Sequence, residues 1–176
     1  VDLPETVDPE RAPALRMLAS LDRAVGHVLG ALERHSRTDD TLVVLMSDNG
    51  GRVREEITNW DLLGKKGELL EGGVRVPLIL RWPEALPRGV EYSKNVSTLD
   101  VVPTALAAAG RTRPKGLDGV DLAPFVLSSL EAADQQVPHP ILYWRQGEQW
   151  ALLEGDHKIV DRGPGPFYRN LADREG

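Results

Sequence analysis

Two short apolar runs joined by a long glycine-rich connection constrain this chain more than any other feature. The first run, residues 42–46, ends at Asp48 and Asn49, which two glycines follow. The second run, residues 77–80, comes after a glycine-rich loop that carries Lys66. Neither run alternates between apolar and polar residues, which is typical of parallel strands covered on both faces. We therefore expect two strands of a parallel sheet, with polar side chains placed at a strand end.

The segments around these runs are predicted to be helical. Apolar residues recur at three- and four-residue steps over residues 12–35, and Pro13 falls in the first turn, where it is tolerated. Ser97 and Asp100 have the spacing of a capping box, which would open a helix over residues 98–109. Helices alternating with apolar strands predict an α/β fold with a mostly parallel sheet and flanking helices.

The last part of the chain has a different sequence pattern. Short β-prone runs separated by glycine-containing turns predict a small antiparallel sheet; the runs are residues 141–144, 150–153, 158–160 and 167–168. We expect a boundary between an α/β part, residues 1–130, and a small antiparallel subdomain, residues 131–176.

Composition excludes several classes of function. With 176 residues the chain can bury a hydrophobic core, and its net charge of −6 argues against a general nucleic-acid surface. The sequence has no apolar stretch long enough to predict a membrane span. It also has no cysteine, so disulfides, thiolate metal sites and a cysteine nucleophile are excluded within this chain.

The polar residues of the connection suggest a metal and an anion. Asp48 and Asn49 offer the hard oxygen ligands that calcium and magnesium prefer, although the same pair is also typical of a turn that bonds its own backbone. Lys66 could neutralise a bound sulfate or phosphate, and charge alone does not separate it from Lys65. Glu71 and Arg75, which flank Gly72 and Gly73, could be substrate groups, but we expect them to form a structural ion pair that pins this loop.

Several motifs, in order along the chain, resemble the type I sulfatases of the alkaline-phosphatase-like superfamily. The central ones are Asp48-Asn49-Gly50-Gly51 and Glu71-Gly72-Gly73-Val74-Arg75-Val76-Pro77. The others are residues 20–26, 59–67, 97–100, 103–104, 117–119, 150–151 and 155–158. The resemblance covers nearly the whole chain and implies the C-terminal part of that fold.

The resemblance implies roles at three positions. Asp48 and Asn49 match calcium ligands of the family, and Lys66 matches a lysine that contacts the sulfate group. The chain departs from the family pattern Pro-Leu-Arg-Gly-Gly-Lys-Gly, because Leu63 replaces the arginine and Lys65 replaces a glycine. A substrate contact from the arginine position is therefore not expected.

The family's nucleophile is missing from this sequence. These sulfatases use a formylglycine made from a Cys/Ser-x-Pro-x-Arg motif, and the chain contains no such motif. In a complete enzyme, the resemblance implies that hydrated formylglycine attacks the sulfur of a sulfate ester, while calcium and Lys66 offset the charge. We expect an inactive C-terminal portion whose partner is a missing N-terminal half, with an exposed sheet edge that invites self-association.

Two alternatives stay open. A phosphoesterase or phosphonate hydrolase of the same superfamily would tend to carry histidine where Asn49 stands, and to use transition metals. A non-catalytic binding domain derived from a sulfatase is the second. The sequence does not predict a compartment or the sulfated substrate.

Overall fold

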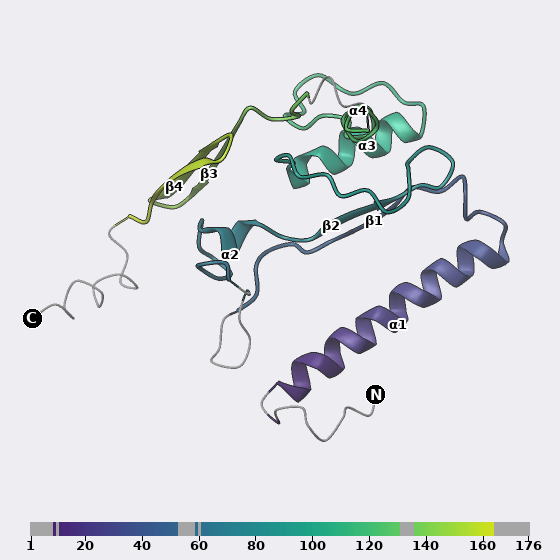
Figure 1. The fold of residues 1–176 in the computed structure, drawn as a ribbon, viewed down its shortest axis with the longest axis horizontal. Coiled ribbons are helices and arrows are strands. Elements are labelled where there is room, and N and C mark those ends of the chain that lie inside the picture. The colour runs from purple at the N-terminus through teal and green to yellow at the C-terminus, as the bar shows by residue number, and fades with distance from the viewer. Residues whose placement is uncertain (1–8, 10, 53–58, 60, 131–135, 164–176) are drawn as a thin grey trace, which may run out of the picture. The chain divides into compact units, whose positions relative to one another are not determined.

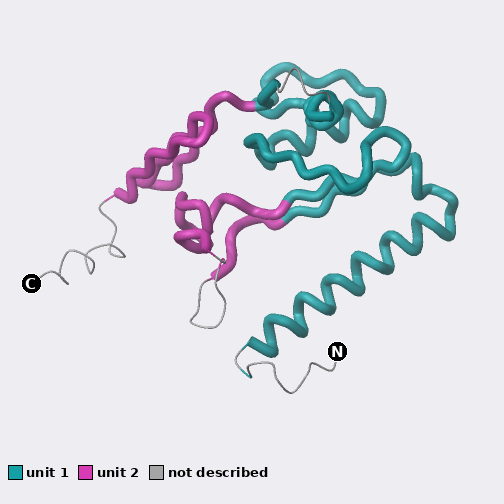
Figure 2. Tube along the Cα trace, in the orientation of Figure 1, with its two compact units in different colours: residues 1–46, 78–138 teal, residues 47–77, 139–176 magenta. Residues whose placement is uncertain are grey.

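The computed structural model of the protein describes residues 9, 11–52, 59, 61–130 and 136–163. The chain divides into two compact units, residues 1–46 with 78–138, and residues 47–77 with 139–176 (Figure 2). The described part is a mixed α/β structure with two small antiparallel sheets, one of two strands and one of three. The predicted boundary between residues 130 and 131 stays a prediction.

The first helix has the predicted position. Helix α1 spans Ala12–Arg34, with its proline in the first turn, and it ends where the His35 amide donates to the carbonyl of Ala31. Several of its apolar side chains are exposed, among them Met17 and Leu18. None of the described helices is both long enough and apolar enough to cross a membrane.

The two central strands pair antiparallel, so the predicted parallel pairing is wrong for them. Strand β1 (Val43–Met46) runs beside β2 (Leu78–Arg81), with Val43 opposite Arg81 and Met46 opposite Leu78 (Figure 1). The segment between the strands begins and ends beside the same end of the pair. There the amide of Ser47, which follows β1, donates to the carbonyl of Pro77, which precedes β2, over 3.2 Å. A parallel pair would need a crossover that returns the chain to the start of β1, usually through a long helix. Helix α2 (Glu71–Val74) has only four residues. No parallel pair occurs among the described residues.

The predicted capping box is present. The 3₁₀ turn η1 (Thr98–Asp100) leads into helix α3 (Val101–Ala108). The Leu99 amide donates to the Ser97 hydroxyl over 3.2 Å, and the Ser97 amide donates to the Asp100 carboxylate over 2.7 Å. Gly110, with φ 63°, follows the helix in the left-handed conformation that commonly ends helices.

Asp100 also joins this turn to a later segment. Its buried carboxylate accepts from the Val120 amide over 2.8 Å. The Thr104 hydroxyl donates to the Asp100 carbonyl over 2.7 Å and accepts from the Leu122 amide over 3.0 Å. Leu122, which is almost fully buried, directly precedes the short helix α4 (Ala123–Ser128). These side-chain bonds hold residues 120–122 against the start of α3.

The C-terminal meander confirms the prediction of a small antiparallel sheet. Strands β3 (Ile141–Gln146), β4 (Gln149–Glu154) and β5 (His157–Asp161) lie in the order β3-β4-β5. Two-residue turns beginning with Gly147 and Gly155, both at positive φ, connect them, as expected for tight hairpins. The predicted run at residues 167–168 lies outside the described residues.

Candidate functional site

The acid and amide that follow β1 form a corner at the strand end. The Asn49 side-chain amide donates to the Asp48 carboxylate over 2.8 Å, and the Ser47 hydroxyl donates to the Asn49 carbonyl over 2.8 Å. The Asp48 side chain is exposed and Asn49 is half-buried. Within the described part of the chain, neither side chain makes another hydrogen bond to the protein. One carboxylate oxygen of Asp48 and the amide oxygen of Asn49 are therefore available to a ligand.

Glycines allow the two ends of the connection to touch. The Gly50 amide donates to the Gly73 carbonyl over 2.9 Å. A Cβ atom on Gly50 would lie 1.7 Å from the Gly72 carbonyl oxygen, and one on Gly73 would lie 2.0 Å from that of Glu68. Both approaches are far closer than van der Waals contact permits, so any larger residue would push the segments apart. These glycines hold residues 70–73 against the loop that begins at Asp48.

The lysine-bearing loop is fixed to the same corner through backbone bonds. The Lys66 amide donates to the Gly51 carbonyl over 3.0 Å. The Asn59 side chain accepts from the Gly51 amide over 2.9 Å and donates to the Gly64 carbonyl over 2.8 Å. The structure thus brings the Lys66 loop to within two residues of Asn49. The Lys66 side chain is exposed, whereas Lys65 is half-buried.

Asn59 shows what sequence reasoning missed. It belongs to a segment that carries the sulfatase resemblance, but the sequence predicted no role for it. In the structure its single amide group binds both loops and clamps them together. An asparagine in a polar segment gives no local signal for such a clamp, because its partners are five and eight residues away.

The predicted pairing of Glu71 with Arg75 is wrong. The Glu71 carboxylate instead accepts from the Lys158 ammonium over 2.6 Å, and Lys158 comes from β5. The described residues give Arg75, whose side chain is exposed, no ion pair. The ammonium of Lys158 also lies 4.9 Å from the centre of the Trp144 ring. Glu71 therefore ties its loop to the meander.

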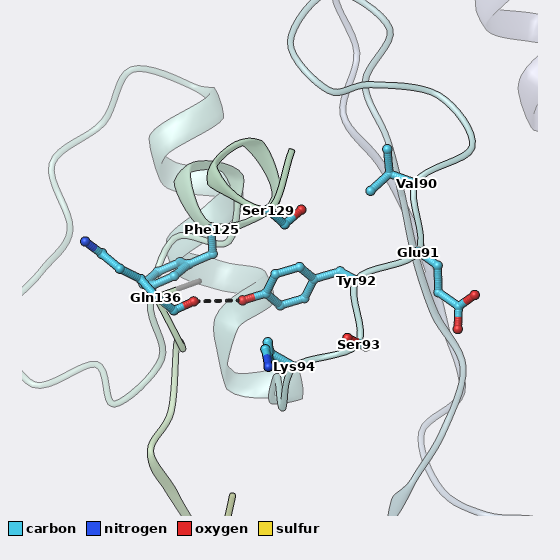
Figure 3. A pocket seen from close by; sticks show the side chains of 8 residues that line it. All are labelled: Val90, Glu91, Tyr92, Ser93, Lys94, Phe125, Ser129 and Gln136. Atoms are coloured by element: carbon cyan, nitrogen blue, oxygen red, sulfur yellow. Dashed lines mark hydrogen bonds between the residues drawn. The ribbon is translucent and has the colours of Figure 1, made fainter. Parts of the chain in front are cut away.

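A separate hollow lies in the unit formed by residues 1–46 and 78–138. Its volume is about 110 Å³ and its lining includes Tyr92, Lys94 and Phe125 (Figure 3). The Tyr92 hydroxyl donates to the Gln136 carbonyl over 3.3 Å, and burial raises the pKa of Tyr92. None of the predicted site residues lines this hollow.

The described residues contain no cluster of three or more histidine, cysteine, aspartate or glutamate side chains able to hold a metal. The corner nevertheless has the donor chemistry of a hard-cation site, a carboxylate beside an amide oxygen. The roles predicted for Asp48, Asn49 and Lys66 stay predictions.

Comparison with known proteins identifies the family. A sequence profile of the family described as Sulfatase matches residues 4–111. The steryl-sulfatase of Rattus norvegicus is 35% identical over 126 residues, covering 66% of this chain and 22% of that protein. The human steryl-sulfatase is 33% identical over 133 residues, covering 70% of this chain and 22% of that protein. The chain therefore belongs to the sulfatase family.

A solved structure agrees with this assignment over most of the chain. The crystal structure of Ps i-CgsB in complex with k-i-k-neocarrahexaose superposes with a TM-score of 0.79 at 32% sequence identity. The match covers 93% of this chain and 37% of that protein. The chain thus spans about a fifth of the length of the steryl-sulfatases and a little over a third of this structural relative.

Proposed function

We propose that the chain is the C-terminal portion of a sulfatase that hydrolyses sulfate esters. One observation carries the proposal: in a chain of the sulfatase family, backbone hydrogen bonds hold the Asp48–Asn49 corner and the Lys66 loop together. A cation site on one loop and an exposed ammonium group on a loop bonded to it would suit the charges of a sulfate ester. The relatives' names mention unlike compounds, a steryl group in one case and a neocarrahexaose in the other, so the proposal extends only to sulfate esters as a class.

Asp48 and Asn49 are proposed to hold calcium. Calcium takes six to eight oxygen ligands, and this corner offers a carboxylate and an amide oxygen, so a second part of the protein must complete the shell. When bound, calcium would supply positive charge next to the sulfate oxygens. The exposed carboxylate of Asp48 and the hydrogen-bonded backbone behind it suit that task.

Lys66 is proposed to bind the sulfate group and to stabilise charge that develops on it during catalysis. Its backbone amide is hydrogen-bonded to Gly51, which fixes the position of the main chain, and its side chain is exposed. The ammonium group is therefore accessible to a ligand. A preorganised cation aimed at developing charge is an effective source of transition-state stabilisation. Lys65, whose side chain is half-buried, is proposed to have no such role.

The nucleophile is proposed to come from an N-terminal half that carries a formylglycine. That half would cover apolar surface that this chain exposes, including Met17 at 73%, Leu18 at 60% and Ile79 at 56% exposure. It would also add the parallel strands of the sulfatase fold beside β1. Covering contiguous apolar side chains is favourable by roughly 25 cal/mol per Å² of apolar surface. By itself the chain is proposed to be inactive.

Two lysines next to each other provide a matched test. In the full-length protein, Lys66→Ala should lower kcat for an aryl sulfate roughly 100- to 1,000-fold, because it removes one preorganised charge from the transition state. Lys65→Ala should leave kcat within about twofold of the parent value.

Parallel assays with an aryl phosphate separate the alternatives. Faster turnover of the phosphate than of the sulfate would favour the phosphoesterase alternative. A full-length protein that turns over neither ester would favour the non-catalytic binding domain. Equal effects of the two alanine substitutions would remove Lys66 from the proposed site.

A further inference from the structure

The C-terminal meander has one covered face, and Lys158 lies on it. Trp144, Ala151 and Val160 are paired across the three strands, and Leu142, Leu153 and Lys158 form the next paired row on the same face. Ala151 is fully buried at the centre. The opposite face is exposed, as Tyr143 and Ile159 show. Lys158 is thus a cation among the mainly apolar, half-buried or buried side chains of these two rows.

A lysine in this position needs partners. Its side chain is only 11% exposed, and taking an ammonium group out of water is costly unless it is paired. The structure supplies the Glu71 carboxylate at 2.6 Å and the face of the Trp144 ring at 4.9 Å. A cation over an indole ring is attracted by the negative charge of the ring face. Lys158 is therefore fixed from two sides.

Glu71 connects this lysine to the candidate site. It directly precedes Gly72 and Gly73, which make the backbone bonds that close the loop. The Gly72 amide donates to the Leu63 carbonyl over 2.7 Å, and the Gly73 carbonyl accepts from the Gly50 amide over 2.9 Å. One bond fixes the start of the Lys66 loop and the other fixes the Asp48–Asn49 corner. A shift of Glu71 would disturb both.

We propose that Lys158 is a positioning residue for the site. Through Glu71 it sets where Lys66 lies relative to Asp48 and Asn49, so the C-terminal meander takes part in ordering the sulfate-binding loop. This inference rests on the proposed function, because its kinetic consequence depends on Lys66 acting on the sulfate group.

The test uses substitutions at both ends of the ion pair in the full-length protein. Lys158→Met keeps an unbranched apolar side chain, one atom shorter, that can still pack on Trp144, but it removes the charge. We expect a roughly tenfold fall in kcat with KM within about twofold. Lys158→Arg should restore most of the kcat. The exchanged pair, Glu71→Lys with Lys158→Glu, should have a higher kcat than either single exchange.

Arg145→Met is the matched control, since it removes an exposed cation from the same sheet and should not change kcat. Amide hydrogen exchange gives a readout that needs no activity. In Lys158→Met, exchange of residues 64–73 should accelerate while that of β1 and β2 stays the same.

The outcomes distinguish this inference from the proposed function. If Lys66→Ala abolishes turnover but Lys158→Met changes neither kcat nor the exchange of residues 64–73, the positioning role is wrong. It is equally wrong if Arg145→Met lowers kcat as much as Lys158→Met. If Lys66→Ala has no effect while the exchange of residues 64–73 still accelerates in Lys158→Met, the proposed function fails and the structural link stands.

Discussion

Two aspartates at the ends of secondary-structure elements, Asp100 in η1 and Asp48 just after β1, have opposite surroundings. Asp100 is fully buried, and its carboxylate accepts backbone amides from Ser97 and Val120. Asp48 is exposed, and in the described part of the chain its carboxylate binds only the side chain of the next residue. A buried carboxylate satisfied by amides holds segments together, whereas an exposed one on a hydrogen-bonded corner is accessible to a ligand. The same side chain is therefore structural in one unit and a candidate ligand in the other.

The largest expected effect is on activity at Asp48. In the full-length protein, Asp48→Ala should lower kcat/KM for an aryl sulfate by roughly 100-fold or more, because the proposed calcium would lose a ligand and stabilise the transition state less. The free energy of unfolding without added metal should change by less than about 0.5 kcal/mol, as expected for an exposed side chain. Steady-state kinetics and chemical denaturation measure the two quantities.

Asp156→Ala is the control for that substitution, since Asp156 is an exposed aspartate in the β4–β5 turn. It should leave kcat/KM unchanged. Suppose that Asp48→Ala lowers the free energy of unfolding by as much as its loss of kcat/KM corresponds to in free energy. The corner would then be structural, and the contrast with Asp100 would disappear.

Asp100 should show the reverse pattern in stability. Asp100→Ala leaves the part-buried amides of Ser97 and Val120 without their acceptor, and we expect a destabilisation of about 3 kcal/mol. Asp100→Asn retains one acceptor oxygen and should cost less. Denaturant titration followed by circular dichroism measures both. A change below about 0.5 kcal/mol in the alanine variant would show that this carboxylate contributes little to the fold.

Thr104 gives a smaller test of the same buried network. Thr104→Val keeps the shape of the side chain but removes a hydroxyl that both donates to Asp100 and accepts from Leu122. We expect a loss of about 1 to 2 kcal/mol in the free energy of unfolding. Thr98→Val, at an exposed position in the preceding turn η1, is the control and should cost less. Equal losses in the two variants would mean that the buried bonds add nothing.

The smallest expected signal is calcium binding by this chain without the proposed N-terminal half. Two side-chain oxygens fall short of the six to eight that calcium takes, so isothermal titration should detect at most weak binding. Asp48→Asn should abolish whatever binding remains. A micromolar or tighter site in the isolated chain would contradict the view that the ligand shell is shared with another part of the protein.

Several elements of the fold were predictable because their causes are local. The proline at the start of α1, the Ser97–Asp100 capping box and the glycine turns of the meander each act within a few residues of themselves. The order of motifs also predicted the family, which the comparisons confirm. The direction of β2 beside β1 was not predictable from an apolar run, because such a run has the same composition in either direction.

The features of the candidate site also divide into those that the sequence predicted and those that it did not. The sequence by itself determined where the acid, the amide and the lysine stand, and that glycines surround them. Only the tertiary structure decided that Glu71 binds Lys158, and that Asn59 clamps two loops. Ion pairs and side-chain clamps depend on which distant segments the folded chain brings together. Residues 71 and 158 meet because the meander and the glycine loop belong to one compact unit. The residues that flank either position in the sequence do not predict that contact.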